Sequence, residues 1–306
     1  MRIVFMGTPA YAVYTLQALV DAGHDVVAAY TRADAASGRG KELRPSEVKV
    51  AAQQLGIPVF TPATFKDLAA VEQLASFKPD ALVVAAYGML LQQSVLDVPR
   101  LGAYNVHASL LPRWRGAAPI HRAILAGDEY AGVCSMKVEL ALDAGDYITA
   151  GSVPTAGKTT DELTNELGRI GAAGMVEALA AEEAGNACWQ VQDESLVTYA
   201  DKISKDETLL SPELSADSAW RRVLASNNRA PARCVVCGKE VTVTSAKPAA
   251  ESVEAGAVLL LKKRIVLGFA SGALELCSVK PQGKKEMPAA GWINGLRAAD
   301  PVWSAI

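Results

Sequence analysis

The sequence is poor in histidine, cysteine and aromatic residues, and it contains no long apolar run. Three histidines occur in 306 residues, and aromatic residues make up 6% of the chain. The five cysteines are an odd set without regular spacing, which argues against a disulfide framework and favours a reducing compartment. The densest apolar stretch, residues 257–261, is long enough only for a strand. Disulfide-rich secreted scaffolds and membrane-spanning proteins are therefore excluded.

The overall composition is that of a globular protein with room for two domains. Half of the residues are hydrophobic, which allows a sizeable core in each domain. The opening residues, 1–7, are too short an apolar run for a signal peptide and predict a buried first strand. We therefore expect a cytoplasmic protein without membrane association.

The modest net charge of −3 conceals an uneven distribution along the chain. From residue 207 to the end there are 13 Lys plus Arg against 9 Asp plus Glu, a net charge of +4 that leaves −7 for the first 206 residues. A basic C-terminal segment on an acidic body indicates a polyanion held by one part of the molecule. A surplus of this size is also compatible with an ordinary solvated face.

The first part of the chain alternates β-branched runs with helical patterns, which predicts a doubly wound, mostly parallel sheet of an α/β domain. We expect Thr8 to cap the first helix, with Pro9 at its first helical position. The expected strands cover residues 3–6, 25–30, 57–60, 82–85 and 103–107, and the expected helices cover residues 9–22, 46–55 and 65–77.

The pattern changes after residue 107. Residues 132–138 and 147–153 predict an antiparallel pair, and Thr159 with Glu162 forms a capping box for a helix that runs to about residue 181. Candidate strands at 234–243, 257–261, 264–269 and 273–279, with helices at 214–225 and 289–296, favour a small OB-like β-barrel. We therefore expect a catalytic domain over residues 1–184, a linker over 185–206 and a barrel domain over 207–306.

The most informative stretch is residues 105–116, at the end of an expected strand. Asn105 and His107 are two residues apart, so on a strand their side chains point to the same face. Pro112 cannot continue the strand, and Asp143 follows in the turn of the antiparallel pair. An amide, an imidazole and a carboxylate that converge supply general acid–base catalysis and oxyanion stabilisation, which indicates group transfer.

No metal centre is expected. His24 and His121 lack ligand partners at sensible spacing. A single histidine after a strand, such as His107, is more often a structural residue, but its position with Asn105 and Asp143 favours the catalytic interpretation. Cys234 and Cys237 form half of a zinc knuckle, but no second pair follows. The glycine after the first strand lacks the G-x-G-x-x-G spacing, which argues against nicotinamide binding.

Several motifs along nearly the whole chain resemble those of the 10-formyltetrahydrofolate-dependent transformylases. The Asn-x-His-x-Ser-Leu-Leu-Pro block with the later Leu-Asp is specific for that group. The Gly-Arg-Gly-Lys loop and the C-terminal domain narrow the resemblance to the branch that acts on initiator methionyl-tRNA. The matching segments are residues 5–9, 37–41, 83–88, 105–120, 142–146, 283–285 and 294–297.

The resemblance implies a Rossmann-like formyltransferase domain followed by a barrel that holds tRNA. Separately, we expect the chain to work as a monomer. The formyl group of 10-formyltetrahydrofolate would pass to the amino group of methionine on initiator tRNA. The implied catalytic residues are Asn105, His107 and Asp143; the implied folate contacts are Ser109, Leu110, Leu111 and Pro112; and the implied tRNA contacts are Arg39, Lys41, Lys262 and Lys284.

Three other functions are also compatible with the sequence. A transformylase acting on a small amine, such as a ribonucleotide or an amino sugar, shares the three catalytic residues but does not need the basic loop of residues 31–45 or a basic barrel. A formyl-folate hydrolase would release formate without an acceptor. A non-catalytic tRNA- or folate-binding module would not need Asn105, His107 and Asp143 intact.

Overall fold

The computed structural model describes residues 1–37, 42–296 and 301–306. The chain divides into two compact units, each built from several segments. The first unit comprises Met1–Pro119, Tyr130–Pro154 and Leu163–Ala200, and the second comprises Ile120–Glu129, Thr155–Glu162 and Asp201–Ile306. The short helix α5 (Pro119–Ala126) therefore belongs almost entirely to the second unit.

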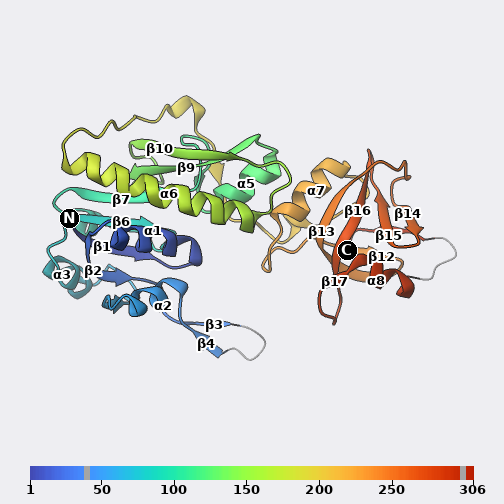
Figure 1. The fold of residues 1–306 in the computed structure, drawn as a ribbon, viewed down its shortest axis with the longest axis horizontal. Helices are drawn as coiled ribbons and strands as arrows, with labels where there is room; N and C mark the ends of the chain where they lie inside the picture. Colours follow the sequence, from blue (N-terminus) through green and yellow to red (C-terminus); the bar gives the residue numbers. More distant parts are fainter. Residues whose placement is uncertain (38–41, 297–300) are drawn as a thin grey trace. The chain divides into compact units, whose positions relative to one another are not determined.

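The first unit is built on one mixed sheet, with strand order β10-β9-β7-β6-β1-β2-β5 (Figure 1). The five strands from β5 to β7 are parallel, and β9 and β10 continue the sheet in antiparallel fashion. This confirms the predicted doubly wound α/β fold and its antiparallel pair. The strands are β1 (Arg2–Gly7), β2 (Asp25–Tyr30), β5 (Val59–Phe60), β6 (Ala81–Ala85), β7 (Gly102–His107), β9 (Tyr130–Lys137) and β10 (Tyr147–Pro154).

Helices cover both faces of this sheet. On one face lie α1 (Ala10–Asp21), α2 (Glu47–Gln54) and the long α6 (Thr160–Glu183), which Figure 1 shows running along the strands. On the other face, α3 (Leu68–Ser76) and α4 (Gln93–Leu96) contribute Leu74 and Val95 to a core that includes Val4 and Met6 of β1. Because Ile3 and Phe5 alternate with these residues and are also fully buried, both faces of β1 are covered.

Helix α6 approaches the sheet closely because three of its residues are glycine. A Cβ atom on Gly171 would lie 2.6 Å from side-chain carbons of both Val106 and Val133, and one on Gly174 would lie 2.3 Å from the Cβ of Ala150. Gly168 similarly lies against Tyr14 of α1. The predicted capping box at the start of the helix is confirmed by the hydrogen bonds between Thr159 and Glu162.

The predicted cap of α1 is wrong. Pro9 is the cap residue and makes no side-chain hydrogen bond, and Ala10 is the first helical residue. The Thr8 hydroxyl instead donates to the carbonyl oxygen of Tyr87 at 2.9 Å, in the loop that follows β6. A bond to the neighbouring strand's loop has replaced the local cap.

The basic loop of residues 31–45 contains a short hairpin, formed by β3 (Ala35–Ser37) and β4 (Glu42–Arg44). Before the hairpin, both carboxylate oxygens of Asp34 accept from Lys49 Nζ at 2.8 Å, which ties this loop to α2. Arg39 and Lys41, two of the residues implied to contact tRNA, lie outside the described residues.

The second unit contains an antiparallel sheet with strand order β14-β15-β16-β13-β12-β18 (Figure 1). The short strand β17 also pairs with β16. Ala257, just before β14, bridges Val302, just before β18, so the barrel is nearly closed, as the OB-like prediction requires. The strands are β12 (Arg233–Val236), β13 (Lys239–Ala249), β14 (Val258–Leu261), β15 (Arg264–Gly268), β16 (Ala273–Pro281), β17 (Met287–Pro288) and β18 (Trp303–Ser304). Helices α7 (Ala216–Ala225) and α8 (Ala289–Trp292) pack against this sheet.

Two sequence predictions in the second unit are wrong in detail. The single strand predicted over residues 234–243 is a hairpin, because Cys237 and Gly238 both have positive φ, of 49° and 73°, and turn β12 back into β13. The helix predicted over residues 289–296 is only the short α8, which continues as a 3₁₀ turn, Ile293–Gly295. Among the described residues, no helix combines the length and the apolar character needed to cross a membrane.

Candidate active site

His107 is the last residue of β7, and its ring is held in one orientation. The residue is only 5% exposed, and its backbone lies opposite Cys134 of β9. Nε2 lies 2.9 Å from the carbonyl oxygen of Trp114. Since a carbonyl oxygen only accepts hydrogen bonds, this contact assigns a hydrogen to Nε2. Nδ1 is therefore the ring nitrogen that can gain or lose a proton.

Asp143 faces that second nitrogen from the loop between β9 and β10. Its Oδ2 lies 3.6 Å from His107 Nδ1, an ion-pair distance rather than a hydrogen-bond distance. The same oxygen accepts a 2.9 Å hydrogen bond from the backbone N–H of Gly116. Asp143 has φ +46°, an unusual value for a residue with a side chain, so the loop holds its backbone in a strained form.

These contacts are complementary to an imidazolium beside a carboxylate. The Gly116 N–H donates to Oδ2, which suits an ionised Asp143. With Nε2 already a donor, a second hydrogen on Nδ1 makes the ring cationic and attracts the carboxylate. The structure thus brings together two of the three predicted catalytic residues in a pair that can hold, supply or accept a proton.

Asn105 lies on the same face of β7 as His107. It pairs with Val84 of β6 and Met136 of β9 in the middle of the sheet. Val106, between the two, points to the opposite face and would meet a Cβ atom on Gly171 of α6. The pleat of the strand therefore directs Asn105 to the side of the sheet where His107 meets Asp143.

The predicted folate-contact segment, residues 109–112, packs largely onto the sheet. Leu111 is buried in a cluster with Cys134 and Met136, and Leu110 lies so close to Gly132 that a Cβ atom there would be 2.3 Å away. Ser109 is also buried, and its Oγ has no hydrogen-bond partner among the described residues. Ser109 therefore has unused hydrogen-bonding capacity, whereas the two leucines anchor the loop; their contact with folate stays a prediction.

The chain region expected to be a linker packs tightly around the site. Its strand β11 (Tyr199–Ala200) pairs with β8 (Arg115–Gly116), and Thr198 Oγ1 accepts from the Trp114 N–H at 2.9 Å. Gln192 lies buried in the same stretch. Sequence reasoning missed these contacts, because residues 185–207 show no periodicity and a single glutamine carries no motif.

The implied tRNA contacts that the structure describes are exposed side chains of the second unit. Lys262 lies in the turn between β14 and β15, and Lys284 lies in the turn between β16 and β17. Arg264, beside the first of these turns, instead pairs with Glu251 and Glu275. Its charge is thus matched within the protein.

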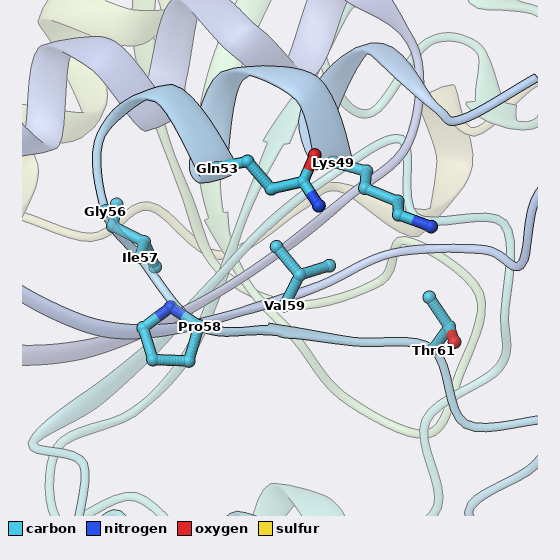
Figure 2. A pocket seen from close by; sticks show the side chains of 7 residues that line it. All are labelled: Lys49, Gln53, Gly56, Ile57, Pro58, Val59 and Thr61. Carbon is cyan, nitrogen blue, oxygen red and sulfur yellow. The ribbon is translucent and has the colours of Figure 1, made fainter.

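A separate open hollow lies away from the predicted catalytic residues, at the edge of the first sheet (Figure 2). Its lining comes from α2 and the segment around β5, namely Lys49, Gln53, Gly56, Ile57, Pro58, Val59 and Thr61. The ammonium of Lys49 is already engaged by Asp34. None of the predicted site residues that the structure describes lines this hollow.

The two cysteines of the half knuckle sit in the β12–β13 hairpin. Burial raises the pKa of the Cys234 thiol to about 12, so this side chain stays a protonated, apolar core residue. Among the described residues, no three His, Cys, Asp or Glu side chains are grouped so that they could hold a metal ion.

Comparisons with known proteins agree with the resemblance seen in the motifs. The chain matches the family model described as formyl transferase over residues 1–179 and the one described as formyl transferase, C-terminal domain, over residues 202–297. A curated relative from Methylococcus capsulatus (strain Bath), named methionyl-tRNA formyltransferase, is 43% identical over 297 residues, which cover 96% of each chain.

Solved structures share the fold at low sequence identity. HypX from Aquifex aeolicus, in complex with tetrahydrofolic acid, superposes with a TM-score of 0.66 at 19% identity and covers 97% of this chain, which spans 47% of the HypX chain. WlaRD, a sugar 3N-formyl transferase, has a TM-score of 0.66 at 13% identity, with coverage of 93% of this chain and 99% of its own. These two likenesses concern the fold alone.

Proposed function

Because the chain belongs to the formyl transferase family, we propose that it transfers the formyl group of 10-formyltetrahydrofolate to the amino group of methionine on initiator tRNA. The product is N-formylmethionyl-tRNA, used for translation initiation, and the other product is tetrahydrofolate. We assign the chemistry to Asn105, His107 and Asp143. The observation that carries this assignment is the 3.6 Å approach of the His107 and Asp143 side chains.

The reaction makes one carbon–nitrogen bond and breaks another. The amine of the methionyl ester attacks the formyl carbon, and the carbonyl oxygen becomes an oxyanion. The intermediate then collapses, the bond from the formyl carbon to N10 of the folate breaks, and the proton lost by the amine passes to N10. The protein must therefore stabilise a negative oxygen and move one proton.

The geometry of His107 suits the first task. Nε2 is held at 2.9 Å by the Trp114 carbonyl, which fixes the ring. The distance of 3.6 Å between His107 Nδ1 and Asp143 Oδ2 is longer than a hydrogen bond, so the Nδ1–H of the imidazolium is available to donate to an incoming oxyanion. The Asn105 amide, on the same face of the strand, is the second donor. A well-placed donor of this kind contributes about 3 kcal/mol to transition-state stabilisation.

Asp143 suits the second task. Its carboxylate faces the imidazole and is anchored by the Gly116 N–H, so it orients the ring, or a water, and assists proton transfer from the amine to N10. In the same proposal, residues 109–112 contact the folate, with Ser109 offering a buried hydroxyl that has no partner among the described residues.

We propose that tRNA is held by the barrel domain over residues 207–306, with the catalytic domain over 1–184 and a connection over 185–206. The exposed turns with Lys262 and Lys284 support phosphate contacts, and Arg39 and Lys41 complete the proposed set. We further propose that the protein acts as a monomer in the cytoplasm; light scattering after gel filtration tests the first statement.

The deciding experiment supplies the purified chain with 10-formyltetrahydrofolate carrying a labelled formyl group. Four reactions are compared, which differ in the formyl acceptor: methionylated initiator tRNA, methionylated elongator tRNA, small amines (a ribonucleotide amine and an amino sugar), and no acceptor. We expect label in the initiator methionyl-tRNA. Label only in a small amine, or formate released without any acceptor, would overturn the proposal in favour of a small-molecule transformylase or a hydrolase.

A further inference from the structure

A buried glutamine, Gln192, is bonded to the loop that carries Asp143. Its Nε2 group donates to the carbonyl oxygen of Asp143 at 2.9 Å and to that of Gly145 at 2.7 Å. The residue is only 6% exposed. Both hydrogens of the amide are therefore used on one short segment of backbone, on either side of residue 144.

The other end of the glutamine amide is bonded to a buried arginine. Arg115 Nε donates to Gln192 Oε1 at 2.9 Å, and Arg115 Nη2 pairs with Glu194 at 2.7 Å. The Arg115 side chain is 4% exposed, so the guanidinium lies almost entirely inside the protein. A donor fixed on Oε1 decides which way the amide faces, and its charge strengthens the amide hydrogens as donors.

We propose that Arg115 and Gln192 are positioning residues for the reaction. They hold the Asp143 loop so that its carboxylate faces the imidazole of His107. This inference rests on the catalytic role proposed above for Asp143. Gln192 is bonded to the backbone of the Asp143 loop, and Arg115 acts on that loop through its hydrogen bond to Gln192.

The backbone of the loop shows why it needs such support. Asp143 has φ +46°, in the left-handed region that few residues with a side chain adopt. The Gly116 N–H holds the carboxylate, but the carbonyl of the same residue is held by Gln192. With the carboxylate and the carbonyl both bonded, the side chain has one direction in which to point. Without the second bond, the loop can relax and carry the carboxylate away from Nδ1 of His107.

The polypeptide around Gln192 is itself fastened to the first unit. Gln190 exchanges two backbone hydrogen bonds of 2.9 Å with Tyr147, and Thr198 Oγ1 accepts from the Trp114 N–H at 2.9 Å. Because the carbonyl of Trp114 faces His107 Nε2, residues 190–200 are bonded next to both members of the proposed catalytic pair. Gln192 is thus presented from a fixed support.

The test is the near-isosteric substitution Gln192→Glu. A glutamate keeps the partner for Arg115 but offers no hydrogen to the carbonyls of Asp143 and Gly145, and it repels them. We expect kcat for formyl transfer to methionyl-tRNA to fall about 10- to 100-fold, with KM for both substrates within about threefold, since a displacement near 1 Å in a catalytic group has an effect of this size. The matched control is Gln73→Glu, at an exposed position of α3 outside this support, which adds the same charge; its kcat should match the parent.

Measuring the same substitution with and without the Asp143 carboxylate tests whether Gln192 acts through it. In an Asp143→Asn background, single-turnover rates should show less than about a threefold effect of Gln192→Glu, because there is no carboxylate left to misplace. A full-sized effect in both backgrounds, or no effect on kcat in the parent, would overturn the inference. If Asp143→Asn alone keeps the parental rate, the role proposed for Asp143 fails, which is a separate result.

A second variant covers the case in which Gln192→Glu does not fold, as judged by circular dichroism and the thermal midpoint. Arg115→Lys keeps the positive charge but removes the Nε donor to Oε1. We expect a fall in kcat of about 3- to 30-fold that is again lost in the Asp143→Asn background. An Arg115→Lys protein with parental kcat and KM contradicts the inference.

Discussion

Replacing Gly116 with alanine adds one carbon atom that should disturb the hydrogen bond holding the Asp143 carboxylate. Gly116 has φ +124°, where side chains are strongly disfavoured, and a Cβ atom there would lie 2.9 Å from the carbonyl oxygen of Ala200. That oxygen cannot withdraw easily, because it accepts hydrogen bonds from the N–H groups of Ala117 and Ala118. The chain must move, and the Gly116 N–H that donates to Asp143 moves with it.

The expected magnitude is the sum of two contributions. A backbone in this region costs a non-glycine residue about 1–3 kcal/mol, and a hydrogen bond to a charged group contributes about 1.5–3 kcal/mol. Because partial relaxation recovers some of both, we expect Gly116→Ala to lower the free energy of unfolding by roughly 3 kcal/mol. We expect kcat to fall at least about tenfold, since the carboxylate loses its fixed place beside His107.

The assay combines denaturant unfolding with single-turnover formyl transfer. The control is Gly185→Ala, at a glycine with φ +71° where the added Cβ, its chain neighbours aside, would have no atom of the described residues within 4 Å. It carries the conformational cost without the collision, so it should lose about 1 kcal/mol and no activity. If Gly116→Ala unfolds like the control and turns over like the parent, the Gly116 N–H does not hold the Asp143 carboxylate in place.

Three further results are expected. Gly171→Ala should destabilise the protein by about 1–2 kcal/mol despite the better helix propensity of alanine, because the new methyl group meets two valines of the sheet. The control Ala173→Gly, at an exposed position of the same helix, measures the propensity difference alone. A stabilised Gly171→Ala protein would contradict the close packing of the helix on the sheet. A hydrogen bond from Arg122 lowers the pKa of Glu207. The contribution of Glu207 to stability is therefore present above its unfolded pKa of about 4.3 and is lost as the pH falls through the lower folded value. The difference in unfolding free energy between the parent and Glu207→Gln should disappear in acid, and a difference that persists there would contradict the pairing. Lys284→Ala should reduce the slope of the logarithm of the tRNA affinity against the logarithm of salt concentration by about 0.7–0.9, and an unchanged slope would remove this residue from the proposed phosphate contacts.

The sequence predicted the frame of the site because the frame depends on local patterns. The spacing of Asn105 and His107 requires only a strand, and the position of Asp143 requires only the turn of an antiparallel pair. Both features follow from the alternation of apolar and polar residues along a strand, which can be seen in the sequence. The side of the sheet on which these residues lie follows from the same alternation.

The sequence could not predict what depends on contacts between distant segments. Thr8 has the chemistry of a helix cap, yet its hydroxyl is taken by the carbonyl of Tyr87, far away in sequence. Cys237 does not resemble a turn residue, yet its positive φ, with that of Gly238, makes a hairpin. Gln192 lies in a stretch without periodicity, and its value comes entirely from the partners that the fold supplies.

The measurement closest to the central claim is the single-turnover rate of formyl transfer to initiator methionyl-tRNA in alanine variants of Asn105, His107 and Asp143. We expect each folded variant to be at least about 100-fold slower than the parent. We also expect the double variant of His107 and Asp143 to be little slower than the slower single variant, because the two side chains, 3.6 Å apart, act as one unit. Any one of the single variants that transfers the formyl group within about threefold of the parental rate would contradict the central claim.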